Sequence, residues 1–168
     1  MANTQKNLTR RLVLSALLAA LTCVMTMVVK IPSPLQGYIN LGDGAVLLCG
    51  WVLNPVYGFL AAGIGSGLAD LLSGYMTYVP ATFVIKGLMA LIVYGGTRLP
   101  WKKGTKILAG IAAEIVMVLG YYVFEGFLYG FVESAVNIPA NAVQGVAGLI
   151  LGLVLSNIFR KTNLFVKD

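Results

Sequence analysis

The sequence predicts an all-α fold, a single domain over residues 1–168 built as a bundle of six transmembrane helices. Composition predicts it first, because 58% of the residues are hydrophobic and only 11% are charged, against about a quarter charged in soluble domains. Several apolar runs also approach the roughly 20 residues that a helix needs to cross the hydrocarbon core. These runs lack the two-residue alternation of barrel strands, so helices are expected to span the membrane.

The basic residues predict how the bundle is oriented. Ten of the twelve lie before the first apolar run, in one gap in the middle of the chain, or after the last run. They are Lys6, Arg10, Arg11, Arg98, Lys102, Lys103, Lys106, Arg160, Lys161 and Lys167. Since basic residues beside spans favour the cytoplasmic side, both termini are expected inside a prokaryotic plasma membrane. This placement accounts for the net charge of +6 without nucleic-acid binding.

The first helix is expected at about residues 11–29, which is too long for the apolar core of a signal peptide and is therefore retained. Ala16 and Ala20 are small residues four positions apart, a spacing that lets membrane helices approach closely. The pair fits a contact inside the bundle or a contact with another subunit. Pro32 and Pro34 end this helix, because proline cannot continue it.

The polar stretch over residues 37–43 is expected to form a lid or wall over a small-molecule site. Tyr38 and Asn40 within it and Gln36 beside it are candidate ligand contacts. Asp43 either caps the next helix, where its charge complements the helix dipole, or contacts the ligand. That helix, at about residues 44–53, is short for a span, so we expect it to be tilted or to reach only part-way.

The third helix is expected at about residues 56–73, after the turn at Asn54 and Pro55. Gly63 and Gly67 predict close packing against a neighbouring helix. They do not form a nucleotide-binding loop, because no strand precedes them. Asp70 lies in the outer turn of this helix, where an acid fits an anchoring role or a functional one.

The fourth helix is expected at about residues 80–95, and Tyr78, Thr82 and Lys86 fall on one of its faces. A lone ammonium group in lipid is costly, so Lys86 must face a partner or a wet cavity. The glutamates of the fifth helix are the expected structural partners. Contact with a substrate is the favoured alternative.

The fifth and sixth helices are expected at about residues 106–127 and 138–159. On the fifth, Glu114, Tyr121 and Glu125 share one face, with Glu125 at the depth of the other polar groups and Glu114 suited to a structural role. On the sixth, an amide stripe in the outer half gives way to glycines in the inner half. The amides are Asn137, Asn141 and Gln144, and the glycines are Gly148 and Gly152. This division predicts a polar cavity above and close packing below.

The polar residues form no phosphate loop, metal cluster or nucleophile–base pair, and the chain contains no histidine. Cys23 and Cys49 both lie within apolar runs and do not indicate a zinc site or a disulfide. No cofactor and no catalysis are therefore expected. These parts are typical of a binding pocket with aromatic walls and a few placed polar groups.

Four segments in their order resemble the S component, the substrate-binding subunit of an energy-coupling factor (ECF) vitamin transporter. They are Gly37-Tyr38-Ile39-Asn40-Leu41-Gly42-Asp43, residues 63–70, Pro80-Ala81-Thr82-Phe83-Val84-Ile85-Lys86-Gly87, and residues 141–145. The resemblance covers essentially the whole chain. It is strongest to the riboflavin-type branch, which includes carriers for hydroxymethylpyrimidine and vitamin B6.

The resemblance implies high-affinity binding of a vitamin or precursor from outside, followed by toppling in the bilayer to release it. It implies a transmembrane coupling subunit and two cytoplasmic ATPases as partners, with ATP hydrolysis in those partners. The small-residue face of the first helix, here Ala16 and Ala20, would contact the coupling subunit. The first outer loop, here residues 37–43, would gate the site.

The candidate side chains favour a small polar heteroaromatic ring, of the pyridoxine or hydroxymethylpyrimidine type, over riboflavin or another vitamin. An alternative class is a self-contained secondary transporter in which Lys86, Asp70 and the glutamates relay ions, although no inverted repeat marks it. The absent catalytic constellation weighs against a membrane enzyme. The polar stripe weighs against a scaffold.

Overall fold

The computed structural model describes residues 2–98 and 104–161, which are almost entirely helical. The elements in chain order are α1 (Ala2–Val28), β1 (Lys30–Pro32), β2 (Tyr38–Asn40), α2 (Gly42–Val52), α3 (Pro55–Leu72), the 3₁₀ turn η1 (Met76–Tyr78), α4 (Val79–Arg98), α5 (Thr105–Tyr129), α6 (Phe131–Ser134), the 3₁₀ turn η2 (Ala135–Asn137) and α7 (Ile138–Lys161). Five helical segments of the described residues are long and apolar enough to cross a membrane, and α2 is a shorter apolar helix. The chain is therefore an α-helical, multi-pass membrane protein.

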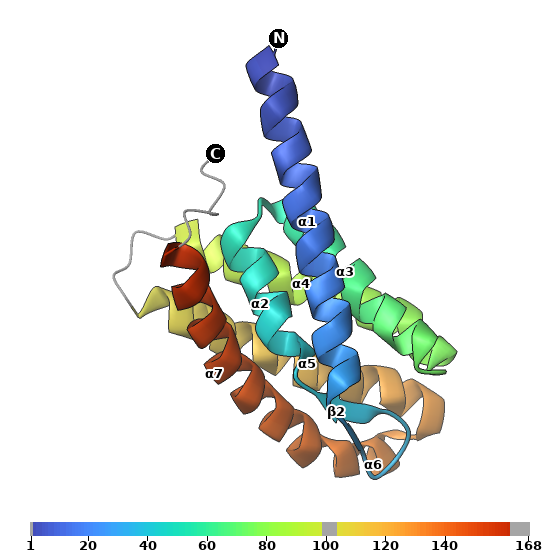
Figure 1. Cartoon of the computed structure of the whole chain (residues 1–168). Helices are drawn as coiled ribbons and strands as arrows, with labels where there is room; N and C mark the ends of the chain where they lie inside the picture. The colour runs from blue at the N-terminus through green and yellow to red at the C-terminus, as the bar shows by residue number, and fades with distance from the viewer. Residues whose placement is uncertain (1, 99–103, 162–168) are drawn as a thin grey trace.

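The connections between helices gather at two opposite ends of the bundle (Figure 1). One end holds the β1–β2 hairpin, the α3–α4 connection and the α5–α7 connection with the short helix α6. The opposite end holds the start of α1, the α2–α3 turn and the end of α7. Lys102, Lys103 and Lys167, which the sequence predicts on the inner side, lie outside the described residues.

The polar stretch after α1 forms a hairpin, which the sequence did not predict. Its two short strands pair antiparallel, with Ile31 opposite Ile39. The turn is closed by the Ser33 amide, which donates to the Gly37 carbonyl at 3.2 Å. Gly37 has a φ of +104°, a conformation that side-chain-bearing residues rarely adopt. The hairpin is thus a defined cover rather than an irregular loop.

Helix α2 is the central helix of the bundle, and all 11 of its residues are buried. Its length corresponds to a rise of about 16 Å, roughly half of the hydrocarbon core, so the expectation of a helix that reaches only part-way fits. Leu47 and Leu48 are fully buried in the same core as Met89 of α4 and Met117 of α5. Apart from Asp43, the helix has no charged side chain, which suits a position that protein surrounds on every side.

Glycines on α3 permit close contact with two neighbouring helices. A Cβ on Gly63 would lie 2.7 Å from the Phe83 carbonyl of α4, which confirms the close packing predicted there. A Cβ on Gly65 would lie 2.4 Å from the Ala19 carbonyl of α1. Such distances leave no room for a side chain, so these helices approach backbone to backbone. By contrast, Gly67 is at ordinary contact distance from Val79.

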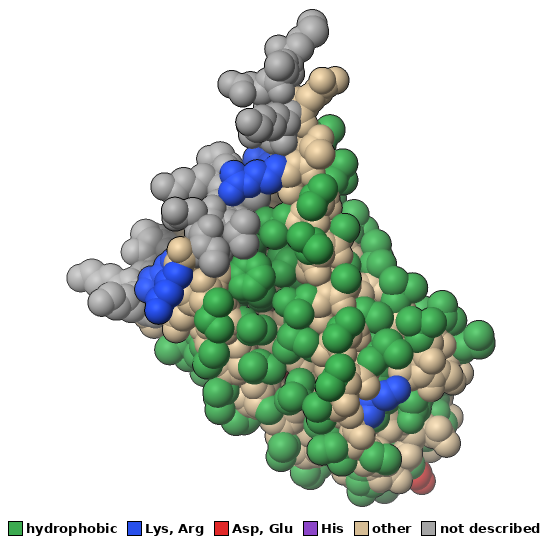
Figure 2. All heavy atoms as spheres, viewed as in Figure 1, with side chains coloured by type: hydrophobic (Ala, Val, Ile, Leu, Met, Phe, Trp, Pro, Cys, Tyr) green, Lys and Arg blue, Asp and Glu red, His purple; other side chains and the backbone are tan. Residues whose placement is uncertain are grey.

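The outer surface of the bundle is apolar, as expected for a protein surrounded by lipid. Large hydrophobic side chains are exposed on every long helix, including Leu17, Val56, Leu108 and Val146. Figure 2 shows them covering one face, with two groups of Lys and Arg toward the end that holds the chain termini and a further one nearer the opposite end. Soluble proteins rarely expose such continuous apolar surface.

Candidate functional site

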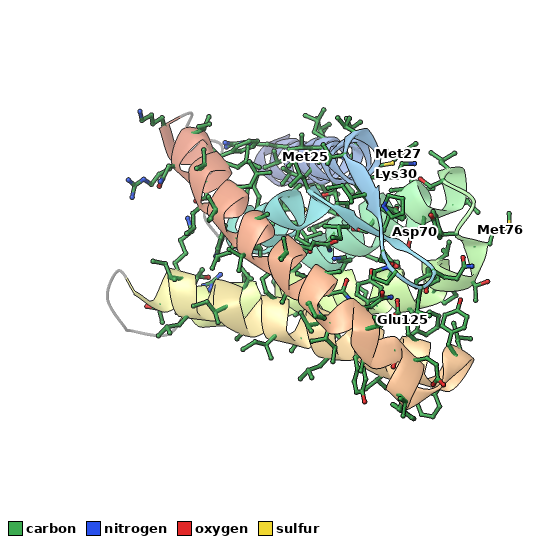
Figure 3. All side chains as sticks on the ribbon, turned by 90° about the horizontal axis from the view of Figure 1, so that it is seen from below. Met25, Met27, Lys30, Asp70, Met76 and Glu125 are labelled. Carbon is green, nitrogen blue, oxygen red and sulfur yellow. The ribbon has the colours of Figure 1, made fainter. Side chains whose placement is uncertain are left out.

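A cavity lies under the β1–β2 hairpin, between α3, α4, α5 and α7. It is lined by Ser33, Gly37, Tyr38, Asn40, Asp70, Tyr75, Tyr78, Thr82, Tyr121, Glu125, Asn141 and Gln144. Its free volume is about 30 Å³, which is room for about two water molecules. Figure 3 labels Asp70 of α3 and Glu125 of α5 at this end of the bundle. The structure therefore has a small polar cavity that the hairpin partly covers.

Most of the sequence-predicted site residues meet at this cavity. Eight of them line it: Tyr38, Asn40, Tyr78, Thr82, Tyr121, Glu125, Asn141 and Gln144. Gln36 and Asn137 do not line the cavity, but each contacts a residue that does. The Gln36 carbonyl is 3.0 Å from the Tyr78 hydroxyl, and the Asn137 side-chain amide donates to Glu125 Oε2 at 2.9 Å. Lys86 lies below the lining.

Four lining residues were not among the predicted ligand contacts: Ser33, Gly37, Tyr75 and Asp70. Asp70 carries a direct link to the hairpin, because the Tyr38 hydroxyl donates to its Oδ1 at 2.7 Å. Burial, followed by the negative charge of Asp70, raises the pKa of the Tyr38 hydroxyl above its ordinary value. The phenol therefore stays protonated and keeps donating. The sequence leaves the role of Asp70 open, because an acid at the outer interface costs little and fits anchoring as well as function.

Aromatic rings form one wall of the cavity. The Tyr38 and Tyr75 ring centroids are 4.8 Å apart, and Tyr75 and Tyr78 meet edge to face at 6.2 Å. The Tyr78 hydroxyl also lies 3.2 Å from Glu125 Oε1. Across the cavity, the Thr82 and Tyr121 hydroxyls are 2.9 Å apart. A flat ligand would find stacking surfaces beside carboxylate and hydroxyl groups.

Asp43 does not cap α2, so that interpretation is wrong. The residue before the helix is Leu41, with no side-chain capping bond. The Asp43 carboxylate is fully buried, where it pairs with the Lys86 ammonium and accepts from Gln144 Nε2 at 2.7 Å. The expected partner of Lys86 was a glutamate of α5, whereas the structure supplies Asp43 of α2. The partner of Lys86 is therefore set by the packing of α2 against α4, which helical spacing in the sequence does not reveal.

Gln144 connects this buried pair to the hairpin. Its Oε1 accepts from the Asn40 backbone amide at 2.9 Å and from the Asn40 side chain at 3.3 Å. Asn40 in turn accepts from the Gly42 amide at the start of α2. One amide side chain on α7 thus joins the cover of the cavity to its floor.

Glu114 lies apart from this network. It is 7% exposed, and neither of its carboxylate oxygens has a hydrogen-bond partner among the described residues. It packs against Gly145 and Gly148 of α7, which leave room for it. The outer side of this contact is an apolar groove between α5 and α7. Among the described residues no group of three or more His, Cys, Asp or Glu could hold a metal ion.

The sequence matches one family over nearly its whole length. The model of the ECF-type riboflavin transporter S component family matches residues 6–161, almost the whole chain. The chain belongs to this family. It is thus a subunit of a vitamin transporter rather than an enzyme, and S components act with the other subunits of an ECF module.

Two curated proteins are similar to this S component along most of its length. The chain is 38% identical over 139 residues to a Pyrococcus woesei protein named "Uncharacterized protein in gap 3'region", covering 82% of this chain and 93% of that protein. It is 27% identical to the "Thiamine precursor transporter HmpT" of Lactococcus lactis subsp. cremoris, covering 92% of this chain and 90% of that protein.

A solved structure has the same fold. It is described as "Structure and mechanism of the S component of a bacterial ECF transporter". The two chains superpose with a TM-score of 0.72 at 24% identity, over 95% of this chain and 99% of the other.

Proposed function

We propose that this S component binds hydroxymethylpyrimidine or a vitamin B6-type ring in the cavity under the hairpin. The observation that carries the proposal is the similarity to a thiamine precursor transporter along 92% of the chain. The lining supports it, because four tyrosines, two carboxylates and three amides suit a small flat ring with several hydrogen-bonding groups.

Riboflavin is the alternative substrate, because the family carries its name. The small volume of the cavity argues for the smaller ring. With about 30 Å³ of free volume, even a pyrimidine enters only when the cover moves. A three-ring flavin would need a much larger displacement of the hairpin and of Tyr75.

The hairpin is the proposed gate, with Asn40 and Tyr38 as its inner contacts. Asn40 is held by Gln144 and Tyr38 by Asp70. The turn is held by the Leu35 amide, which donates to Asn137 Oδ1 at 3.3 Å, and by the Gln36 carbonyl, which accepts from the Tyr78 hydroxyl. Opening would break a small number of hydrogen bonds and expose the cavity from the hairpin end. Gln36, Lys86 and Asn137 would then act from the second layer, by positioning Tyr78, Asp43 and Glu125.

The proposed topology has six crossings in a single domain, with both termini inside a prokaryotic plasma membrane. Helix α2 together with the hairpin makes the second crossing. This arrangement places the hairpin end outside and the termini inside, in agreement with Arg10, Arg11, Arg160 and Lys161 near the opposite end.

The proposed partners are a transmembrane coupling subunit and two cytoplasmic ATPases. Ala16 and Ala20 are both exposed on α1, whereas Leu14 and Leu18 on the same helix are buried in the core. The small-residue face therefore points away from the bundle. A helix of the coupling subunit could approach it closely.

Calorimetry on the purified chain in lipid nanodiscs tests the substrate. Hydroxymethylpyrimidine, pyridoxine and riboflavin are titrated in parallel, after removal of any bound molecule and its identification by mass spectrometry. We expect tightest binding for hydroxymethylpyrimidine or pyridoxine. Asn141→Ala and Glu125→Ala should weaken it, while Glu133→Ala, an exposed acid on α6, should not. Tighter binding of riboflavin would overturn the preference for the small ring.

A further inference from the structure

The charges around the cavity are unbalanced. Its lining includes the carboxylates of Asp70 and Glu125 and, among the twelve lining residues, no lysine or arginine. Both carboxylates are buried, at 6% and 3% exposure. A buried carboxylate is stable only with donors or an opposite charge around it. Here the described donors are neutral hydroxyl and amide groups: Tyr38 on Asp70, and Tyr78 and Asn137 on Glu125.

The nearest cations do not neutralise these acids. The Lys86 ammonium is paired with Asp43 and lies 5.3 Å from the centroid of the Tyr121 ring. The Lys30 ammonium is exposed, donates to Ser73 Oγ at 2.8 Å and lies 5.7 Å from the centroid of the Tyr38 ring. Each cation thus contacts a ring that lines the cavity without lining it itself. The cavity presents tyrosine rings and carboxylate oxygens to its occupant.

A positively charged ligand is attracted both to the faces of aromatic rings and to carboxylate oxygens. An amino group beside a protonated ring nitrogen offers two parallel N–H donors, the fork by which a guanidinium binds a carboxylate. Asp70 retains acceptor capacity for such a fork, because an ionised carboxylate has about four lone-pair sites. Glu125 already has a donor near each oxygen, so Asp70 is the better acceptor.

We infer that this cavity selects a positively charged amino-heterocycle, with Asp70 as its principal acceptor, and excludes phosphate esters of the same ring. The inference rests on the proposed role of the cavity as the substrate site. A phosphate in the cavity would need a positive counter-charge, and the nearest buried one is the Lys86 ammonium. That ammonium is already paired with the Asp43 carboxylate. Asp43 is therefore a positioning residue for charge selectivity.

The test uses matched ligand pairs on the chain in nanodiscs. The first set is hydroxymethylpyrimidine with its 4-amino group, the analogue with oxygen in place of that amino group, and the phosphate ester. We expect the amino compound to bind at least about 10-fold tighter than the oxo analogue, since an unmatched buried acceptor costs more than 1 kcal/mol. We expect at least about 100-fold over the phosphate ester, because like charges repel strongly in a buried site. Equal or tighter binding of either comparison ligand would overturn the inference.

Asp70→Asn tests the residue. The carboxamide keeps the shape, loses the charge and can donate to an oxo group, so the preference between the amino and oxo compounds should fall or invert. Glu133→Gln is the matched control, an exposed acid on α6 whose neutralisation should leave the ratio unchanged. If folded Asp70→Asn keeps the wild-type ratio of affinities for the amino and oxo compounds, Asp70 is not the principal acceptor. If that variant does not fold, the ligand ratios of the wild-type chain decide whether the cavity selects by charge. Glu125→Gln should then change the ratio less than about 10-fold, and a larger change would make Glu125 the principal acceptor.

Two further pairs separate this inference from the choice of substrate: pyridoxamine against pyridoxine, and riboflavin against its phosphate ester. If neither the pyrimidines nor the B6 compounds bind but riboflavin binds tighter than its phosphate ester, the substrate proposal fails and the exclusion of phosphate esters stands. If the flavin phosphate binds as well as riboflavin, charge selectivity fails. If no member of any pair binds, both are wrong.

Discussion

Lys86 of α4 and Asp43 of α2 form an ion pair at the centre of the bundle, with side chains 3% and 0% exposed. Gln144 of α7 completes the coordination of the carboxylate. Three helices therefore meet at one buried acid. The pair connects the packing of the bundle to the floor of the cavity.

Asp43→Asn should destabilise the protein strongly, by about 3–5 kcal/mol, because it leaves the Lys86 ammonium buried without its counter-charge. Urea or SDS unfolding in micelles measures this loss. Replacing both partners, as Asp43→Leu with Lys86→Met, should cost less than either single change. Glu114→Gln is the contrasting variant, since its carboxylate has no partner among the described residues. It should be neutral or stabilising, and equal losses for Asp43→Asn and Glu114→Gln would contradict the difference in pairing.

Gln144→Leu should loosen the hairpin, because Asn40 loses the acceptor of its backbone and side-chain amides. We expect substrate to dissociate about 10-fold faster, as the loss of one or two buried hydrogen bonds implies. Stopped-flow fluorescence measures the dissociation rate. Asn157→Leu, an exposed amide near the far end of α7, should leave it unchanged. An unaltered rate in Gln144→Leu would mean that this amide does not hold the gate closed.

Ala16→Leu should separate the chain from its coupling subunit while leaving substrate affinity intact. The added side chain fills the exposed small-residue face of α1, which close helix approach requires. Copurification with the ECF module, measured beside calorimetry on the isolated chain, separates the two effects. Ala112→Leu adds the same group to an exposed position of α5 and should preserve the complex. Full recovery of the complex with Ala16→Leu would place the interface elsewhere.

Gly148→Ala should destabilise the contact between α7 and α2. The added Cβ would lie 2.6 Å from the Asp43 Cβ and 3.0 Å from Glu114 Oε1, and overpacking of this kind costs about 1–3 kcal/mol. Gly95→Ala on α4 meets nothing within 4 Å, so it should stabilise its helix by about 0.5–1 kcal/mol. Thermal unfolding of the two variants side by side checks the opposite signs.

Much of the fold could be predicted from the sequence, because continuous apolar runs in a bilayer have few alternatives to helices. The long helices lie within a few residues of their predicted positions, except that α1 begins at Ala2 rather than near residue 11. Its start was missed because the amphipathic and polar residues before Leu12 carry no hydropathy signal. The hairpin was missed as well, because strands of three residues leave no periodicity to recognise.

The site was predictable only in part. Helical spacing placed Asn141 and Gln144 on one face, and both line the cavity. Spacing cannot tell which helix a face meets, so the pairing of Lys86 with Asp43 and of Tyr38 with Asp70 was beyond reach. Both pairs join residues of different elements, and only the packed bundle brings them together.

The short length of α2 has a consequence for the energetics of uptake. With the hairpin end outside, as proposed, the cavity lies above a helix that rises about 16 Å, against a core of about 30 Å. A ligand in the cavity would therefore lie about half-way across the hydrocarbon core. Below it, α7 packs closely against α2 at Gly148 and Gly152, so the short route inward is filled by the bundle itself. Release on the inner side would then require the whole subunit to reorient, as the proposed toppling does.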